Sequence, residues 1–199
     1  MNPAALSPAA GSNAAEVCKR LQLSDEALKL LHGPLRLSEF QALLISKEMF
    51  ADAVRVTAAC LAPRFALWWG TLCLWSLNSP EPEPAQWAVF QAVIAWLKEP
   101  SDEHRRAAEA AGRAAGLNTP AGNLGLAVFL SEGSLSLPNL PAVAPGPYLT
   151  PKTVGAALVQ ASQKLGPGKS KACQARFLGV AHEVARGELS WESSTASGS

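Results

Sequence analysis

Residues 166–170 have the sequence GPGKS, and their last three residues, Gly-Lys-Ser, are those that end a phosphate-binding loop. A Walker A loop also needs a glycine at position 163 and a buried strand before it, because its backbone N–H groups must surround the phosphates. Position 163 holds Gln163, and the residues before it favour a helix. We therefore interpret 166–170 as a turn between helices. The open alternative is a weak anion site at a helix start, with four basic side chains nearby: Lys164, Lys169, Lys171 and Arg176.

His182 and Glu183 begin like the zinc-binding motif HExxH, in which two histidines four residues apart share one helical face. The position four residues after His182 holds Arg186, so the second ligand is missing. The other histidines, His32 and His104, have no cysteine or aspartate at ligand spacing. The sequence predicts no metal and no cofactor.

Nucleophiles and acids are scattered along the chain. Residues 133–135 lack the second glycine of a GxSxG nucleophile elbow. Apolar neighbours, which raise thiol pKa values, surround all four cysteines: Cys18, Cys60, Cys73 and Cys173. Helix starts and an exposed linker account for the paired acids: Asp25 with Glu26, Asp102 with Glu103, and Glu81 with Glu83. The sequence therefore predicts no catalytic residues and no enzymatic activity.

Arg64 and the six tryptophans are the candidate binding residues. Arg64 begins an apolar stretch, where a guanidinium needs a carboxylate or carbonyl partner; structural pairing and a place in a partner or ligand site both stay open. We expect Trp68, Trp69 and Trp75 to fill the core. Exposed indoles with apolar neighbours can anchor a protein interface. The predicted partner-binding residues are Trp87, Trp96, Arg64 and Trp191.

Two helices must position these side chains. Residues 63–77 are apolar at every helical angle, with Trp68, Leu72 and Trp75 on one side, which places this helix in the middle of a bundle. Its uninterrupted apolar run is thirteen residues long, too short for a membrane span of about 20 residues. Residues 85–99 carry apolar side chains over half of the helix circumference, with a tryptophan at each edge, so we expect this helix to contact at least two others.

Capping residues and apolar spacing predict the remaining helices. These cover residues 13–22, 24–32, 38–61 with a break near 46–48, 101–116, 120–130, 150–165 and 170–186. The proline-rich residues 131–149 are predicted to be extended and packed on the bundle. The side chains expected to hold them there are Leu135, Leu137, Leu140 and Tyr148.

Composition sets the class of the protein. The 199 residues are 48% hydrophobic and 17% charged, which excludes a disordered chain. We predict an all-α, irregular bundle of eight or nine helices around residues 63–77. It forms a single domain at 13–191 between mobile tails at 1–12 and 192–199. A net charge of +1 gives no field that would attract nucleic acid. Unpaired cysteines and the lack of a legible signal sequence favour the cytoplasm.

Five stretches carry a family resemblance: LAPRFALWW at 61–69, the alanine-rich residues 107–115, GSL at 133–135, residues 145–150 and VARGELSW at 184–191. Over residues 35–191 the chain resembles an uncharacterised bacterial family, a domain of unknown function. Such proteins are associated with gene clusters for type VI secretion and related contractile machines. The resemblance implies an accessory or adaptor role in the cytoplasm and supplies no catalytic residues.

We therefore predict a non-catalytic protein that binds a protein partner. The alternative is a small-ligand-binding protein or enzyme whose pocket lies beside Arg64 and the tryptophans. Convergent titratable groups in a deep pocket would favour the alternative, and an exposed aromatic patch would favour an interface. The partner's identity and the oligomeric state stay open.

Overall fold

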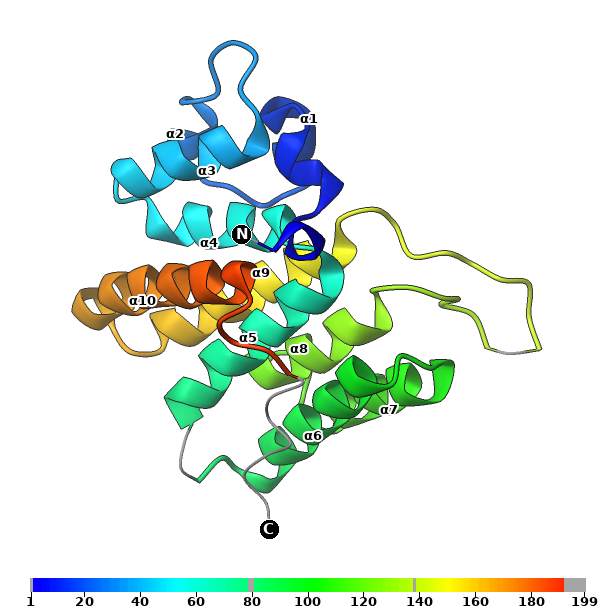
Figure 1. Ribbon diagram of the computed structural model, residues 1–199. Helices are drawn as coiled ribbons and strands as arrows, with labels where there is room; N and C mark the ends of the chain where they lie inside the picture. The colour runs from blue at the N-terminus through cyan, green and yellow to red at the C-terminus, as the bar shows by residue number, and fades with distance from the viewer. Residues whose placement is uncertain (1, 79–80, 138, 192–199) are drawn as a thin grey trace.

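The computed structural model describes residues 2–78, 81–137 and 139–191 and is all-helical, as predicted (Figure 1). Two 3₁₀ turns, η1 (Pro3–Ala5) and η2 (Pro8–Gly11), come first. The α-helices of the described residues are α1 (Ala14–Cys18), α2 (Asp25–Leu28), α3 (Leu37–Ser46), α4 (Phe50–Cys60), α5 (Pro63–Asn78), α6 (Pro84–Lys98), α7 (Asp102–Ala114), α8 (Pro120–Phe129), α9 (Leu149–Gln163) and α10 (Pro167–Arg186). The predicted break near 46–48 is confirmed, because Glu48 has a φ of 56° and separates α3 from α4, and the helices number ten where eight or nine were predicted.

Helix α5 lies at the centre of the bundle, which confirms its expected position. It packs against α6, α8, α9 and α10. Leu67, Trp69 and Leu74 on α5 are all at most 1% exposed, because neighbouring helices cover most of the circumference of this apolar helix. Among the described residues, no helix combines the length and the apolarity that crossing a bilayer requires.

The N-terminal helices have a core of their own. Phe40 and Leu44 on α3 and Val56 on α4 are fully buried there, together with alanines of η2 and α1. Helix α4 also contributes Val54 and Ala58 to the larger core around α5. Because residues on its different faces enter both cores, α4 joins the two parts of the molecule.

Residues 2–12 pack on the bundle, so the prediction of a mobile tail at 1–12 is wrong for them. Ala5 is fully buried, the Ser7 N–H donates to the Cys60 carbonyl at 2.9 Å, and the Ala62 N–H donates to the Ala5 carbonyl at 2.9 Å. A proline begins each of the two 3₁₀ turns; Ala5 lies at the junction of α4 and α5, and Ala9 and Ala10 pack in the N-terminal core. The second predicted tail, 192–199, lies outside the described residues.

Helices α7 and α8 approach each other through glycines. A Cβ atom built on Gly125 would lie 2.5 Å from the Ala108 carbonyl oxygen and 2.9 Å from the Gly112 Cα atom. Only a residue without a side chain allows two helix backbones to approach this closely. The alanine-rich face of α7 is therefore matched by glycine on α8.

The proline-rich stretch after α8 leaves the bundle. In Figure 1 it projects to the right as a long loop between α8 and α9. Leu137 is 61% exposed and Leu140 is 54% exposed, whereas Leu135 and Tyr148 near the two ends are half-buried. The expectation that Leu137 and Leu140 pack on the bundle is wrong. We refer to residues 134–147, apart from the undescribed position 138, as the projecting segment.

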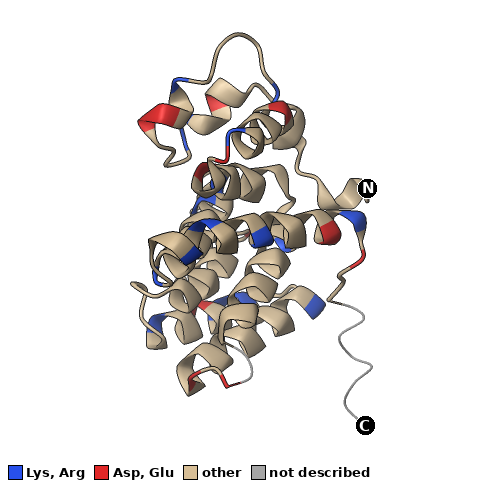
Figure 2. Ribbon diagram, turned by 90° about the vertical axis from the view of Figure 1, so that its left-hand side faces the viewer, with Lys and Arg blue, Asp and Glu red and all other residues tan. Residues whose placement is uncertain are grey.

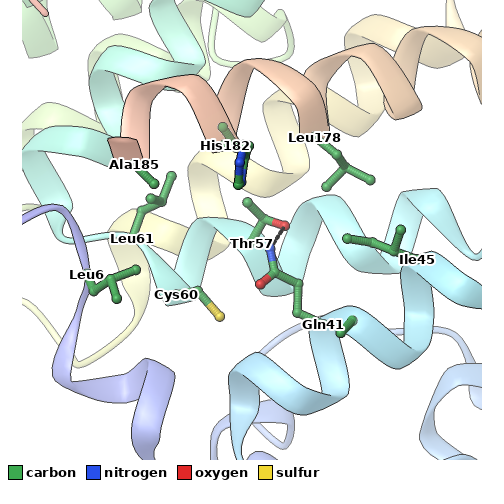
Figure 3. Close-up of a pocket in the computed structure, with 11 residues that line it drawn as sticks. Leu6, Gln41, Ile45, Thr57, Cys60, Leu61, Leu178, His182 and Ala185 are labelled. Atoms are coloured by element: carbon green, nitrogen blue, oxygen red, sulfur yellow. Dashed lines mark hydrogen bonds between the residues drawn. The ribbon is translucent and has the colours of Figure 1, made fainter. Parts of the chain in front are cut away.

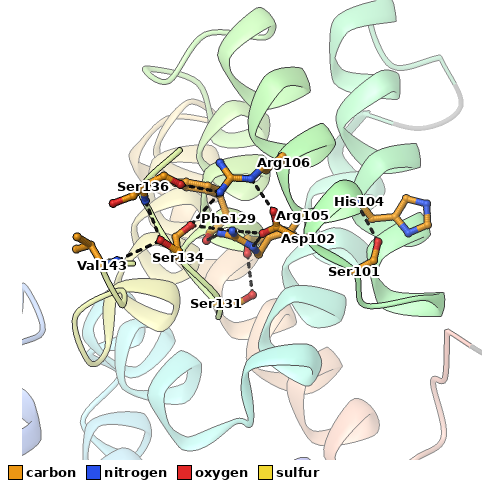
Figure 4. A network of polar contacts seen from close by, with 11 residues as sticks. Ser101, Asp102, His104, Arg105, Arg106, Phe129, Ser131, Ser134, Ser136 and Val143 are labelled. Atoms are coloured by element: carbon orange, nitrogen blue, oxygen red, sulfur yellow. Dashed lines mark hydrogen bonds and ion pairs between the residues drawn. The ribbon is translucent and has the colours of Figure 1, made fainter. Parts of the chain in front are cut away.

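Two arginines of α7 hold the base of the projecting segment (Figure 4). Arg105 is 1% exposed and donates hydrogen bonds to the carbonyls of Phe129, at 2.7 Å, and Ser134, at 2.8 Å. Arg106 donates to the Ser136 carbonyl at 2.7 Å. Both guanidiniums also pair with Asp102 one turn earlier on α7. Hydrogen bonds from Arg106 and Arg105 hold the pKa of Asp102 below its ordinary value.

The segment is also hydrogen-bonded to itself above this base. The Leu135 N–H donates to the Val143 carbonyl at 2.8 Å, and the Val143 N–H donates to the Ser134 hydroxyl at 3.1 Å. The Leu140 N–H donates to the Leu137 carbonyl at 3.0 Å. This hydrogen bond closes a turn that lies between Leu135 and Val143. The apolar side chains of the segment are therefore carried on a folded loop that is anchored at its start.

Candidate functional site

An open apolar groove lies between α5 and α6. We call it the tryptophan groove; its volume is about 300 Å³. It is lined by Trp68, Thr71, Leu72 and Trp75 of α5 and by Trp87, Phe90 and Ile94 of α6. The lining residues recur at three- and four-residue spacings along both helices, and such spacings bring side chains to one helical face. The side of α5 that the sequence groups as Trp68, Leu72 and Trp75 is thus one wall of the groove.

Aromatic rings are in contact at the mouth of the groove. The ring centroids of Trp75 and Trp87 are 5.5 Å apart with an interplanar angle of 46°, and those of Trp75 and Phe90 are 5.8 Å apart in an edge-to-face arrangement. Trp87 is 42% exposed, whereas Phe90 is 1% exposed. The inner wall is therefore fixed by core packing, and Trp87 presents its indole to solvent.

The groove offers little hydrogen bonding and no charge. Thr71 carries the one hydroxyl group among the lining residues, and it donates to the Leu67 carbonyl at 2.8 Å. The Trp68 indole N–H donates to the Leu189 carbonyl at 3.1 Å. Both groups are already satisfied by backbone, so a partner would be bound mainly through apolar contact.

Trp96, predicted as a partner-binding residue, is 1% exposed, and that prediction is wrong. Helix α6 contacts α5, α7 and α8, one helix more than the minimum expected from its apolar arc. Val89, Val93 and Leu97 on the same arc are also fully buried. The neighbouring helices therefore cover the arc at Trp96 and leave the edge at Trp87 open.

Arg64 at the start of α5 contacts both the end of α6 and Trp191, which follows α10. The Arg64 guanidinium donates to the Leu97 carbonyl at the end of α6 and lies 5.1 Å from the centroid of the Trp191 ring. Trp191 is 8% exposed and packs edge-to-face on Phe65, with centroids 5.0 Å apart. Arg64 thus pairs with a backbone carbonyl, as the structural alternative in the sequence analysis expects. Of the four predicted binding residues, only Trp87 lines the groove.

A second pocket of about 210 Å³ lies where α3, α4 and α10 meet (Figure 3). Within it the Gln41 amide donates to the Thr57 hydroxyl at 2.7 Å, and this hydroxyl donates to the Ala53 carbonyl at 2.7 Å. His182 and Cys60 also line it. Burial raises the pKa of Cys60 to about 12, with a smaller contribution from Cys18, so this thiol is neutral at physiological pH.

The other thiols behave in the same way. Burial raises the pKa of Cys18 to about 11 and also raises the pKa values of Cys73 and Cys173. All four cysteines are buried, and none is in a disulfide bond. The expected apolar burial and raised thiol pKa values are confirmed, and the inertness of the thiols stays a prediction. Within the described residues, no group of three or more His, Cys, Asp or Glu side chains could hold a metal ion.

The predicted turn between helices is present but lies at 164–166, and residues 167–170 form the first turn of α10 instead of a loop. Helix α9 ends at Gln163, Gly166 has a φ of 85°, and α10 begins at Pro167. Figure 2 shows basic and acidic residues spread over several helices of the face it presents. The basic residues around the turn are not drawn together into a site; Lys171 pairs with Glu48 at 2.6 Å.

The sequence interpretation missed two arrangements. It grouped three α5 residues of the groove on one side, but it could not show that Phe90 and Ile94 of α6 face them. It also interpreted Asp102 only as part of a helix start, whereas Asp102 orients Arg105 and Arg106. Spacings of three and four residues between an acid and two arginines were the available signal.

Comparison with known proteins places the chain in a family. A model described as a family of unknown function (DUF6931) matches residues 40–185, which is more than half of the chain. These residues include both walls of the tryptophan groove and the projecting segment. No curated protein and no solved structure matches the chain. The chain therefore belongs to the DUF6931 family, whose function is unknown.

Proposed function

We propose that this protein is a non-catalytic accessory or adaptor that binds a protein partner in the tryptophan groove. The observation that carries the proposal is the exposure of Trp87 at 42% beside Trp75 and an open apolar hollow. Exposed tryptophans next to well-packed apolar side chains are the residues that most often dominate binding energy at protein interfaces. Trp87 would be the anchor, and Leu72 and Ile94 would flank it.

The physical character of the groove favours a protein surface over a charged ligand. No lining side chain is charged, and the Thr71 hydroxyl and the Trp68 indole N–H already have backbone partners. An apolar side chain or a proline ring could displace water from the indole faces without removing any charged side chain from water. A nucleic acid or another anion would find no positive side chain in the groove.

Binding of an apolar small molecule in the same groove is the second candidate. The volume of about 300 Å³ lies at the lower limit of pockets that enclose ligands. The groove is open and has no convergent polar groups to orient a small molecule, whereas an extended protein surface gains its orientation from contacts around the groove. We therefore prefer the protein partner.

We further propose that the partner belongs to a type VI secretion system or a related contractile machine in the bacterial cytoplasm. The support is the resemblance of the residues at 61–69 and 184–191 to proteins associated with such gene clusters. This assignment predicts that the captured partner is encoded in the same gene cluster.

Affinity capture from native cytosol, followed by mass spectrometry, tests the proposal. The wild-type protein is compared with Trp87→Ala and with the control Leu28→Ala. Leu28 lies on α2, is 40% exposed, and is far from α6 (Figure 1). We expect Trp87→Ala to weaken capture of a specific protein about thirtyfold, as loss of an interface hot spot does. Equal recovery by the wild type and Trp87→Ala, with both proteins folded by circular dichroism, would refute the proposal.

A further inference from the structure

The most exposed large apolar side chains of the described residues occur in two places. Leu137, Leu140 and Val143 on the projecting segment are 61%, 54% and 53% exposed, and Trp87 in the tryptophan groove follows at 42%. A soluble chain normally keeps such side chains covered or scattered singly. Three of them on one loop, together with an open aromatic groove elsewhere, indicate two surfaces that need a partner.

The two surfaces match in chemistry. The projecting segment has the sequences SLSL at 134–137 and NLPAVAPGP at 139–147, which contain leucine, valine, alanine and proline but no charged residue. The groove is lined by indole and phenyl rings and also has no charged residue. Proline-rich segments are recognised by aromatic-lined grooves, because a pyrrolidine ring packs flat on an indole face and the restricted chain loses little entropy on binding. Docking of the segment in the groove would therefore remove no charged side chain from water.

The segment is also prepared for binding before it meets a partner. Arg105 and Arg106 fix its base, and the mutual hydrogen bonds of Leu135, Val143 and Ser134 hold its two arms together. A loop that is already ordered loses less conformational entropy when it docks than a flexible chain would. The exposed leucines and valine are therefore presented on a structured loop.

The segment of a given molecule lies away from that molecule's own groove. In Figure 1 it projects to the right, whereas the end of α5 that carries one wall of the groove lies at the lower left. The arginines of α7 anchor the segment in this direction. Contact between the two surfaces therefore requires two molecules.

We propose that the projecting segment of one copy of this chain docks in the tryptophan groove of a second copy, head to tail. The inference rests on the proposed function, because it names the partner of the same groove. The interface is heterologous, so the second copy keeps a free segment and the first copy keeps a free groove. Association therefore continues into rings or open chains as the protein concentration rises. It is insensitive to salt because neither surface carries charge.

Sedimentation of purified full-length variants tests the inference by complementation. The groove variant is Trp87→Ala, and the segment variant combines Leu137→Ser, Leu140→Ser and Val143→Ser. All four side chains are exposed, so both variants should fold, and circular dichroism checks this. We expect the average mass of the wild type and of the control Leu28→Ala to increase with concentration. We expect each variant alone to remain monomeric.

The equimolar mixture of the two variants is the decisive sample. It contains one intact segment, on Trp87→Ala, and one intact groove, on the segment variant. We expect it to form dimers and nothing larger, because only one productive contact is possible. A wild type that stays monomeric over the concentration series, or a mixture that stays monomeric while the wild type associates, would overturn the inference. If the wild type is monomeric but Trp87→Ala loses a different protein in the capture experiment, the inference fails and the proposed function stands.

Discussion

Arg105 and Arg106 of α7, which we call the arginine clasp, bind the base of the projecting segment through hydrogen bonds. Replacing Arg105 tests how strongly they hold it. The side chain is 1% exposed, and its guanidinium donates to the carbonyls of Phe129 and Ser134 at 2.7 and 2.8 Å. It also lies 4.6 Å from the centroid of the Phe129 ring. Its ionic partner Asp102 is 58% exposed, so solvent screens that pair and we assign it no share of the free energy.

The carbonyl contacts set the magnitude for Arg105→Ala. Hydrogen bonds from a charged donor contribute about 1.5–3 kcal/mol each, and a contact between a guanidinium and a ring adds about 0.5–2 kcal/mol. Water that enters the vacated site recovers part of this total. We expect the free energy of unfolding to fall by about 3–5 kcal/mol. Arg105→Lys keeps the charge but loses the forked geometry, and we expect a loss of about 1–2 kcal/mol.

Denaturant unfolding measures these changes, and Arg113→Ala is the matched control on the same helix. Arg113 is 61% exposed and pairs only with Glu109 one turn away, so its removal should change the free energy by less than about 0.5 kcal/mol. Limited proteolysis gives the second readout, because a released base should speed cleavage within residues 134–147. A loss below about 1 kcal/mol for Arg105→Ala, with unchanged proteolysis, would show that the clasp does not hold the segment.

Three further predictions follow from packing and titration. Gly125→Ala should destabilise the protein by more than about 2 kcal/mol in denaturant unfolding, because its Cβ would lie 2.5 Å from a carbonyl oxygen of α7. Gly179→Ala, with open space around its Cβ, should stabilise it by about 0.5–1 kcal/mol; equal effects would contradict the close approach of α7 and α8. The pKa of Asp102 is lowered in the folded state, so its contribution to stability is present above the unfolded pKa and lost as the pH falls through the folded value. Asp102→Asn should therefore make the free energy of unfolding depend less on pH below about pH 4. The same pH dependence in Asp102→Asn and the wild type would contradict this. With pKa values raised to about 11 and about 12, Cys18 and Cys60 should resist alkylation at neutral pH until the protein unfolds; fast labelling of the native protein would show that they are accessible.

The helices were predictable because their signals are local. The apolar circumference of residues 63–77 indicated a central helix, and capping residues with short apolar spacings indicated most of the others. The N-terminal turns were missed because their burial depends on Ala5, Ala9 and Ala10, small residues that give no apolar period in the sequence.

The candidate site was predictable only in part. Trp87 and Trp96 both lie at edges of the apolar arc of α6, and the sequence cannot show which edge a third helix covers. Leucines between prolines suggested packing along the whole of residues 131–149. The turn between Leu137 and Leu140 and the clasp from α7 instead direct the segment outward. Both outcomes depend on contacts between residues far apart in the chain, which spacing rules do not describe.

Site-specific photo-crosslinking in cells tests the central claim, that the tryptophan groove binds protein. Benzoylphenylalanine replaces Ile94, which lines the groove, in one variant and Leu28 on α2 in another, so that Trp87 is kept in both. We predict a discrete protein adduct from position 94 and none from position 28, and its mass identifies either a second copy of this chain or a different protein. No adduct at position 94, or the same adducts at both positions, would contradict the account.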